Sequence, residues 1–132
     1  MSNRVIHILV LATLLVSIIA PIPASSGAVD PLSKIHPLLL QKLQGMRGDE
    51  IVEVVVRIEP LPQSIRAQVK GNYWQAVSSL MAWARTTQEP VINWVKSVGG
   101  VVLNTFWLDN VILVKIPVKY VYELAKIPSV VK

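Results

Sequence analysis

The two strands predicted within residues 99–117 constrain the fold more than any other part of this chain. The segment reads GGVVLNTFWLDNVILVKIP, with apolar runs at residues 101–108 and 111–116. Asp109 and Asn110, which separate the runs, tolerate the positive φ angles of a type I′ turn, so the segment predicts a β-hairpin with a two-residue loop. A hairpin with one solvated face alternates apolar and polar residues, and this one does not. We therefore expect each of its faces to be covered.

Three further elements and the start of a fourth surround the hairpin. Residues 50–58 alternate between the two faces of a predicted strand. Residues 72–98 carry apolar or small residues every three or four positions, with Gln88 in the same stripe, which is the period of an α-helix. Because the stripe stays in phase across Pro90, we expect one long helix, kinked there and ended by Gly99-Gly100. Residues 118–127 predict a shorter helix that ends before Pro128, and residues 129–132 begin another strand.

The order of these elements is that of the ferredoxin-like, split βαβ plan. We therefore predict an α+β fold: an antiparallel sheet with two helices on one face and a fourth strand truncated at Lys132. Residues 29–49 are interpreted as a lead-in segment with a short helix at 37–44, preceding a domain at 50–132. A chain of 132 residues is long enough for one domain and a leader.

Two helices cover one face of such a sheet, yet the other face is also apolar. The residues expected to face the helices are Val102, Phe106, Leu108, Ile112, Val114 and Ile116. Those expected on the opposite face are Ile51, Val55, Val101, Leu103, Thr105, Trp107, Val111, Leu113 and Lys115. An apolar surface of this size is typical of a protein interface, because leaving it in water costs about 25 cal/mol per Å². The alternatives are cover by residues 29–49 and self-association.

Residues 1–28 have the features of a secretory signal peptide. Arg4 supplies the basic start, residues 5–20 form an apolar stretch, and PIPASSGA supplies small residues before an expected cleavage after Ala28. A retained membrane anchor is the alternative, but an apolar helix of this length rises about 24 Å, against about 30 Å of hydrocarbon core. We therefore expect the protein to be secreted or to lie on the exterior of the cell envelope. The sequence contains no cysteine, so packing rather than disulfide bonds must stabilise it.

Catalysis by this chain is not expected. His36 is the one histidine beyond the leader; no serine has a G-x-S-x-G context, and no second metal ligand lies at a suitable spacing from His36. Glu50 and Glu53 fall on opposite faces of the predicted strand, so they do not form an acid–base pair. The net charge of +5 comes from scattered basic residues, and Trp83 and Trp94 lie at the helical spacing typical of packing. We therefore predict no nucleic-acid, metal or cofactor site.

Several short motifs follow one another through residues 50–132. EIVEVVVRIEP comes first, and TQEPVINWVKSVGG ends the long predicted helix. FWLDN, with Phe106, Trp107 and Asn110, and then VILVKIP form the hairpin, and LAKIPSVVK ends the segment. In this order and spacing, the segment resembles the propeptide, or inhibitor I9, domain of subtilisin-like serine proteases.

The resemblance implies a non-catalytic folding chaperone or temporary inhibitor of a subtilisin-like protease, acting in cis or in trans. It also implies that the second sheet face packs on two surface helices of the protease. The contact residues would be Ile51, Val55, Val101, Leu103, Trp107, Val111 and Leu113. In such domains the segment after the fourth strand occupies the active-site cleft. Because that segment is missing here, inhibition by occupation of the cleft is in doubt, and docking of the sheet is the part that can be tested.

Two other interpretations remain open at this point. The chain is alternatively a structural, self-associating subunit of an envelope assembly that uses the same sheet face. An enzyme is expected only if a catalytic domain follows Lys132 in a longer precursor.

Overall fold

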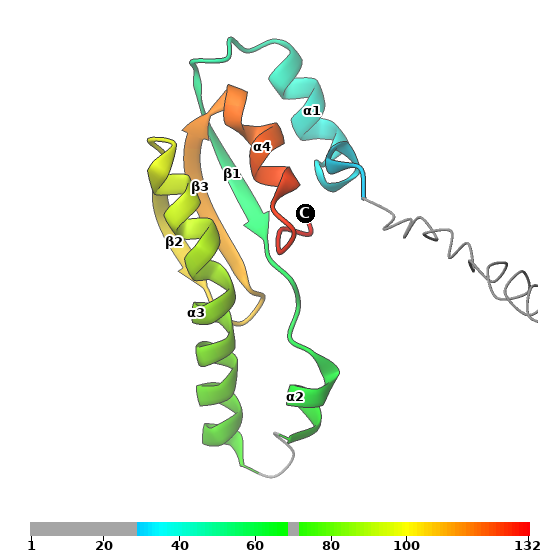
Figure 1. Ribbon diagram of the computed structural model, residues 1–132, viewed down its shortest axis with the longest axis vertical. Coiled ribbons are helices and arrows are strands. Elements are labelled where there is room, and N and C mark those ends of the chain that lie inside the picture. The colour runs from blue at the N-terminus through cyan, green and yellow to red at the C-terminus, as the bar shows by residue number, and fades with distance from the viewer. Residues whose placement is uncertain (1–28, 69–71) are drawn as a thin grey trace, which may run out of the picture.

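The computed structural model describes residues 29–68 and 72–132, which form a sheet with helices on one side (Figure 1). The strands are β1 (Ile51–Arg57), β2 (Val101–Phe106) and β3 (Val111–Pro117). β3 is central and pairs antiparallel with both neighbours, in the order β1-β3-β2. The predicted α+β class is confirmed, and the architecture is compatible with the ferredoxin-like plan. The predicted signal peptide, residues 1–28, lies outside the described residues.

The two predicted helices of the domain lie on the same side of the sheet (Figure 1). α3 (Tyr73–Ser97) contacts β2 and β3, and α4 (Val121–Lys126) follows the 3₁₀ turn η2 (Val118–Tyr120). Before β1 the chain forms the 3₁₀ turn η1 (Pro31–Lys34) and α1 (Pro37–Gln44), which is the predicted short helix. A further short helix, α2 (Gln63–Gln68), follows β1 and was not expected. None of the described helices combines the length and apolarity needed to cross a bilayer.

The hydrophobic core lies between the sheet and the helices. β1 alternates strictly, so that Val52, Val54 and Val56 are buried while the residues between them are exposed. On β3 the matching inward positions, Ile112, Val114 and Ile116, are fully buried. The helices contribute Val91, Val95, Val121, Leu124 and Ala125 to the same cluster. Burying each of the larger side chains stabilises the fold by about 1.5–3 kcal/mol.

α3 continues through Pro90 as one helix, as its in-phase stripe predicts. Asn72 caps its start, because its Oδ1 accepts hydrogen bonds from the N–H groups of Trp74 and Gln75. The buried residues of α3 begin at Ala84, whereas Trp74 is 74% exposed, since the first turns extend past the end of the sheet (Figure 1). The C-terminal half of α3 is therefore the part that packs on the sheet.

Two glycines connect α3 to β2, for different reasons. Gly99 has a φ of +79°, the left-handed conformation predicted for the helix stop. Gly100 permits close packing instead, because a Cβ at this position would lie 2.6 Å from Cγ2 of Ile116 and 2.8 Å from Cγ1 of Val95. The absence of a side chain at Gly100 thus lets the chain pass between α3 and β3.

The hairpin loop is longer than predicted. Phe106 pairs with Val111, so the loop comprises residues 107–110, and β2 ends two residues earlier than expected. A type I′ turn needs positive φ at both central residues. Among the described non-glycine residues, Asn110 alone has one, at +50°, so the predicted two-residue loop is wrong. Leu108 was expected to face the helices but is a loop residue, 67% exposed.

The side chain of Asn110 fixes this loop against α3 and the end of β1. Its Oδ1 accepts a hydrogen bond from Nε2 of Gln88 at 3.0 Å. Its Nδ2 donates to the C=O of Glu59 at 2.7 Å and to Oγ1 of Thr87 at 2.9 Å. Gln88 Nε2 also donates to the C=O of Phe106, and all three of Thr87, Gln88 and Asn110 are buried. This network explains why two polar residues of α3 lie within its apolar stripe.

β2 contains a β-bulge that reverses its alternation. Val102 pairs with Val114, but the next pairing joins Asn104 to Leu113, so Leu103 and Asn104 together oppose one residue of β3. Beyond the bulge, Thr105 pairs with the buried Ile112 and Phe106 pairs with Val111. The predicted faces of Thr105 and Phe106 are therefore wrong: they are exchanged.

Asn104 gives a physical reason for the bulge. Its Oδ1 accepts a hydrogen bond from the N–H of Thr105 at 2.8 Å. Such a local side-chain bond offers the backbone an alternative to the regular ladder. The register of β2 shifts between Val102 and Asn104, next to this bond.

Residues 29–49 pack on the helix side and leave the second sheet face uncovered. Ile35 belongs to the core, and η1 contacts α4, beside which α1 lies in Figure 1. Three leucines of α1 and Met46 pack against the same core. On the other face, Ile51 and Val55 remain 57% and 66% exposed. The alternative in which the lead-in segment covers that face is therefore wrong.

The last residues lie along the free edge of β1. Val130 forms an isolated bridge with Ile58, and the N–H of Arg57 donates to the C=O of Lys132 at 2.7 Å. The N–H groups of Glu59 and Val131 form further bonds across the same edge. This pairing amounts to one bridge, so the fourth strand stays a prediction.

Candidate docking surface

The sheet face opposite α3 and α4, called the open face below, carries a largely apolar set of side chains. The register of the strands places its residues in four cross-strand rows. From the start of β1 onward these are Ile51–Pro117; Glu53–Lys115–Val101; Val55–Leu113 with Leu103 and Asn104; and Arg57–Val111–Phe106. Apolar residues therefore occur in every row and on all three strands.

Most apolar side chains of the open face are exposed to solvent. Five of them are between 43% and 66% exposed: Ile51, Val55, Val101, Leu103 and Phe106. Leu113, between them on the central strand, is half-buried. A contiguous exposed apolar patch on a small domain marks an interaction surface more often than isolated exposed residues do. The open face is thus the strongest candidate for a binding surface among the described residues.

The open face carries few charges, and two of them form a pair. Nζ of Lys115 lies 3.8 Å from Oε2 of Glu53, and both side chains are about half exposed. An exposed pair at this distance contributes little to stability, typically below about 1 kcal/mol. Arg57 adds one positive charge at the far row. Apolar contact rather than charge attraction is therefore what this face offers a partner.

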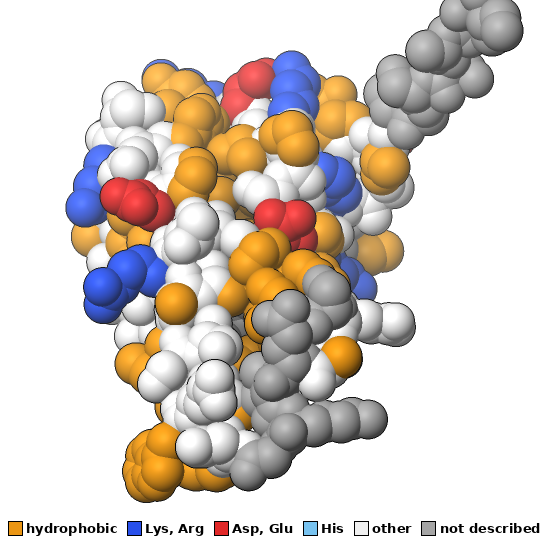
Figure 2. Space-filling model, turned by 60° about the horizontal axis from the view of Figure 1, so that its bottom comes forward, with side chains coloured by type: hydrophobic (Ala, Val, Ile, Leu, Met, Phe, Trp, Pro, Cys, Tyr) orange, Lys and Arg blue, Asp and Glu red, His pale blue; other side chains and the backbone are white. Residues whose placement is uncertain are grey.

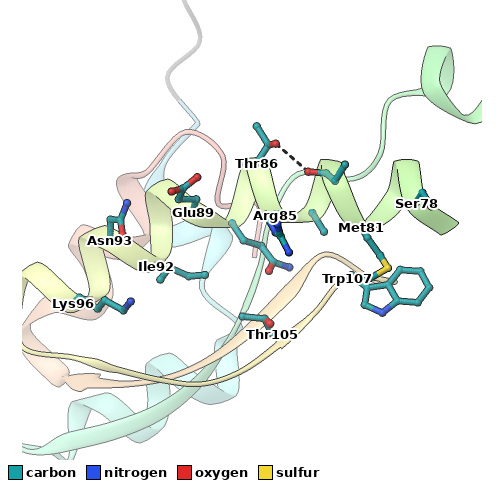
Figure 3. A pocket seen from close by; sticks show the side chains of 13 residues that line it. Ser78, Met81, Arg85, Thr86, Glu89, Ile92, Asn93, Lys96, Thr105 and Trp107 are labelled. Carbon is teal, nitrogen blue, oxygen red and sulfur yellow. Dashed lines mark hydrogen bonds between the residues drawn. The ribbon is translucent and has the colours of Figure 1, made fainter. Parts of the chain in front are cut away.

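Trp107 does not lie on the open face, which corrects its predicted position. It belongs to the loop after β2 and lines a groove of about 820 Å³ on the helix side, together with Thr105 and residues of α3. Figure 3 shows its ring next to Met81 of α3. The bulge in β2 and the longer loop together turn this part of the hairpin toward α3. Trp107 therefore supports its own helix rather than a partner on the opposite side.

The other predicted contact residues divide into two groups. Ile51, Val55, Val101, Leu103 and Leu113 are placed together on the open face, as expected. Val111 is there by register, but its neighbours leave it only 9% exposed, so it offers little area to a partner. Phe106 is the aromatic residue of the open face, and sequence reasoning missed it. The polar Asn104 within an apolar run was the available signal for a bulge.

The groove beside α3 has a different character from the open face. Its α3 wall carries Arg85, Glu89, Asn93 and Lys96, with charges of both signs (Figure 3). Within residues 29–68 and 72–132, no three or more His, Cys, Asp or Glu side chains come together as metal ligands do. The groove therefore shows no arrangement of groups that assigns it a chemical task.

Two of the side chains noted in the sequence, Trp94 and His36, have structural partners, whereas the indole N–H of Trp83 is buried without a hydrogen-bond partner among the described residues. Trp94 packs edge-on against Tyr120 with ring centroids 6.4 Å apart, which joins α3 to the start of α4. His36 precedes α1, and its Nδ1 accepts a hydrogen bond from the N–H of Leu38. The described structure thus gives His36 a capping contact, and Trp94 a packing contact.

A second group of exposed hydrophobic side chains lies at the tip of the molecule where α3 begins. Figure 2 views this end and shows hydrophobic side chains at its lower tip, apart from the other groups. Tyr73 and Trp74, the first residues of α3, are 73% and 74% exposed, with their rings 5.2 Å apart. This tip is smaller than the open face and belongs to two successive residues.

An ion pair on α4 affects the titration of Lys126. The hydrogen bond to Glu123, at 2.7 Å, raises the pKa of Lys126 above its ordinary value. The pair lies one helical turn apart on α4, where it stabilises the helix and is distant in the fold from the rows of the open face. It therefore belongs to the helix and not to the candidate surface.

Comparison with family models, with curated proteins and with solved structures finds no match for this chain.

Proposed function

We propose that this chain is a secreted, non-catalytic module of the propeptide or inhibitor I9 type that binds a subtilisin-like serine protease through its open face. Binding would assist the folding of the protease, inhibit it, or both. The observation that carries the proposal is the position of the apolar side chains. α3, α4 and the lead-in segment pack on one side of the sheet, while five apolar residues on the other side stay exposed.

The fold and the corrected residue set are compatible with this proposal. The order β1-β3-β2 with helices on one face is that of the domain type which the sequence resembles. The proposed contact residues are now Ile51, Val55, Val101, Leu103, Phe106 and Leu113, with Phe106 taking the place of Trp107. Their exposure leaves them available without unfolding any described element.

The test compares two charge substitutions at apolar positions of similar exposure. Val101 is 56% exposed on the open face, and Leu38 is 69% exposed on α1. Val101→Glu is expected to weaken inhibition and assisted refolding of a subtilisin-like protease by at least about tenfold, because a carboxylate would be desolvated at the interface. Leu38→Glu is expected to change neither. Circular dichroism verifies that both variants are folded.

Three results would contradict the proposal. The first is a parent chain without effect on the folding or activity of any subtilisin-like protease tested. The second is that both variants act as the parent does. A third result distinguishes the other candidate. If sedimentation shows a dimer that Val101→Glu converts to a monomer, without any effect on a protease, the open face serves self-association in a structural subunit.

A further inference from the structure

The start of α3 carries two aromatic side chains, Tyr73 and Trp74, that are more exposed than any other large hydrophobic side chain of the described residues. Their exposed fractions are 73% and 74%. The rings meet edge-on, with centroids 5.2 Å apart and planes inclined by 75°. Because the first turns of α3 extend past the end of the sheet, the pair lies at a tip of the molecule (Figure 1). A flat surface can therefore contact both rings without meeting the sheet.

The sequence around this tip is basic. Residues 60–88 include three basic residues and no aspartate or glutamate, whereas the whole chain has eight acidic residues. Arg66 is exposed on α2, which ends four positions before Asn72, so the end of α2 lies within about 15 Å of the start of α3. Arg85 is exposed on α3 itself. The tip thus combines exposed aromatic rings with positive charge.

The tip is small for a contact with another protein. An aromatic side chain buries about 150–250 Å² when it is fully covered, so these two rings offer roughly 200–400 Å². A stable protein interface takes about 800 Å² from each partner. A bilayer imposes no such minimum, because binding to it grows with the apolar area inserted and with the attraction of basic residues to anionic lipid. The area and the charge therefore fit a lipid surface better than a second copy of this chain.

We propose that Tyr73 and Trp74 insert into the head-group layer of a bilayer that contains anionic phospholipid. Tryptophan and tyrosine are enriched at this level, because their rings are apolar while the N–H or O–H group stays hydrated. Met81 and Arg85 follow Trp74 by seven and eleven positions and so share its side of α3. Met81 is 48% exposed, so α3 would meet the bilayer obliquely, with Arg85 directed at the lipid phosphates. The tip is separate from the open face and does not rest on the proposed function.

The experiment measures the quenching of tryptophan fluorescence by brominated lipid in the full chain. The vesicles contain equal amounts of phosphatidylcholine and phosphatidylglycerol, brominated near the top of the acyl chains. Residues 1–28 contain no tryptophan, so the signal does not depend on lipid binding by the predicted leader. Quenching is expected with these vesicles. It is expected to be about fivefold weaker with phosphatidylcholine alone, and also in 1 M salt, where the Debye length is only about 3 Å.

Two pairs of variants locate the inserted rings. Trp74→Phe removes the reporter at the tip and is expected to abolish most of the quenching, whereas Trp94→Phe, at a packed ring further along α3, is expected to keep it. Tyr73→Ser keeps the reporter but removes about half of the aromatic area, so it is expected to weaken the quenching by about fivefold. Leu38→Ser, at a residue of similar exposure on α1 at the other end of the molecule (Figure 1), is expected to change nothing.

Several outcomes would overturn the proposal. A parent chain without quenching, equal quenching by phosphatidylcholine alone, or quenching that persists in Trp74→Phe would each exclude insertion of this tip into an anionic bilayer. A dimer that sedimentation detects without lipid, and that Trp74→Ser dissociates, would assign the tip to a second copy. Val101→Glu is expected to lose protease binding and to retain the quenching, which separates this surface from the proposed function. Circular dichroism of each variant excludes loss of the fold as the cause.

Discussion

Replacing Asn110 tests whether its buried side chain fixes the hairpin loop. Asn110 is 4% exposed and joins three segments, through Gln88 and Thr87 of α3 and the C=O of Glu59. Its φ of +50° is tolerated by asparagine but is unfavourable for alanine. Asn110→Ala therefore removes three hydrogen bonds and strains the backbone at the same time.

The expected loss of stability follows from these two effects. Each hydrogen bond contributes about 1 kcal/mol net, and the left-handed conformation costs alanine about 1–2 kcal/mol. Asn110→Ala is therefore expected to lower the free energy of unfolding by about 4 kcal/mol, where a domain of this size typically has only about 5–15 kcal/mol. Asn110→Gly loses the same bonds without the strain, so it is expected to be the less damaging variant by about 1 kcal/mol.

Urea denaturation measures these differences. Tryptophan fluorescence reports on Trp107 in the hairpin loop and on the three tryptophans of α3, and circular dichroism at 222 nm reports the unfolding of the helices. With a denaturant slope of about 1–3 kcal/mol per molar, Asn110→Ala is expected to lower the midpoint by about 2 M. A loss below about 1 kcal/mol for both variants would refute the role given to the network. Equal stability of the alanine and glycine variants would refute the role of the positive φ.

Asn110→Asp adds a pH dependence to the same test. The new carboxylate would face the C=O of Glu59 at the position of Nδ2, so burial and this acceptor would raise its folded pKa above the unfolded value of about 3.9. The protonated acid donates as the amide does, which favours the fold below that pKa. Stability of this variant relative to the parent is therefore expected to fall as pH rises from about 3 to 7. A relative stability that is constant over this range would contradict the geometry.

Three further predictions concern other parts of the fold. Gly100→Ala is expected to destabilise by at least about 2 kcal/mol because its Cβ would overlap packed atoms, whereas Gly99→Ala meets open space and is expected to lose only about 1 kcal/mol; urea titration separates them. A double-mutant cycle on Glu53 and Lys115 is expected to give a coupling below about 0.5 kcal/mol, and a larger value would mean that the pair is better ordered than its exposure indicates. Deletion of Leu103 is expected to keep the fold but to straighten the β2 edge, so sedimentation should show more self-association, and an unchanged monomer would contradict a protective role for the bulge.

Elements with a sustained period were predictable from the sequence, because their pattern reports burial directly. The alternation of β1 and the three-to-four spacing of α3 each continue over several residues, and both elements were confirmed close to their expected bounds. The helix was predicted to continue through Pro90 because the apolar stripe stays in phase on both sides of it, and α3 does so. α1 was also predicted at its observed position, although the packing of its leucines against the core required the tertiary structure.

The hairpin was predictable as a hairpin but not in its details. A bulge and a longer loop each depend on local hydrogen bonds that periodicity does not report. Here those bonds are made by two asparagines, Asn104 to the neighbouring N–H and Asn110 to α3 and Glu59. Asparagine favours such local bonds over ladder positions, so its presence signals an irregularity without specifying which one. The sheet face on which Thr105, Phe106 and Trp107 lie depends on which irregularity forms, so it could not be predicted.

The prediction of an apolar open face does not depend on the facing of residues 105–107, although Trp107, one of the residues predicted on it, lies elsewhere. The run FWL at residues 106–108 holds large apolar side chains at successive positions, so either phase of the strand presents one of them outward. The bulge selects Phe106, at 46% exposure, and turns Trp107 toward Met81. A test of docking that truncates Trp107 would therefore perturb the packing of α3 and report on stability. Truncation of Phe106 would remove apolar area that a partner can cover. Phe106 is therefore the aromatic position whose truncation tests the docking proposal.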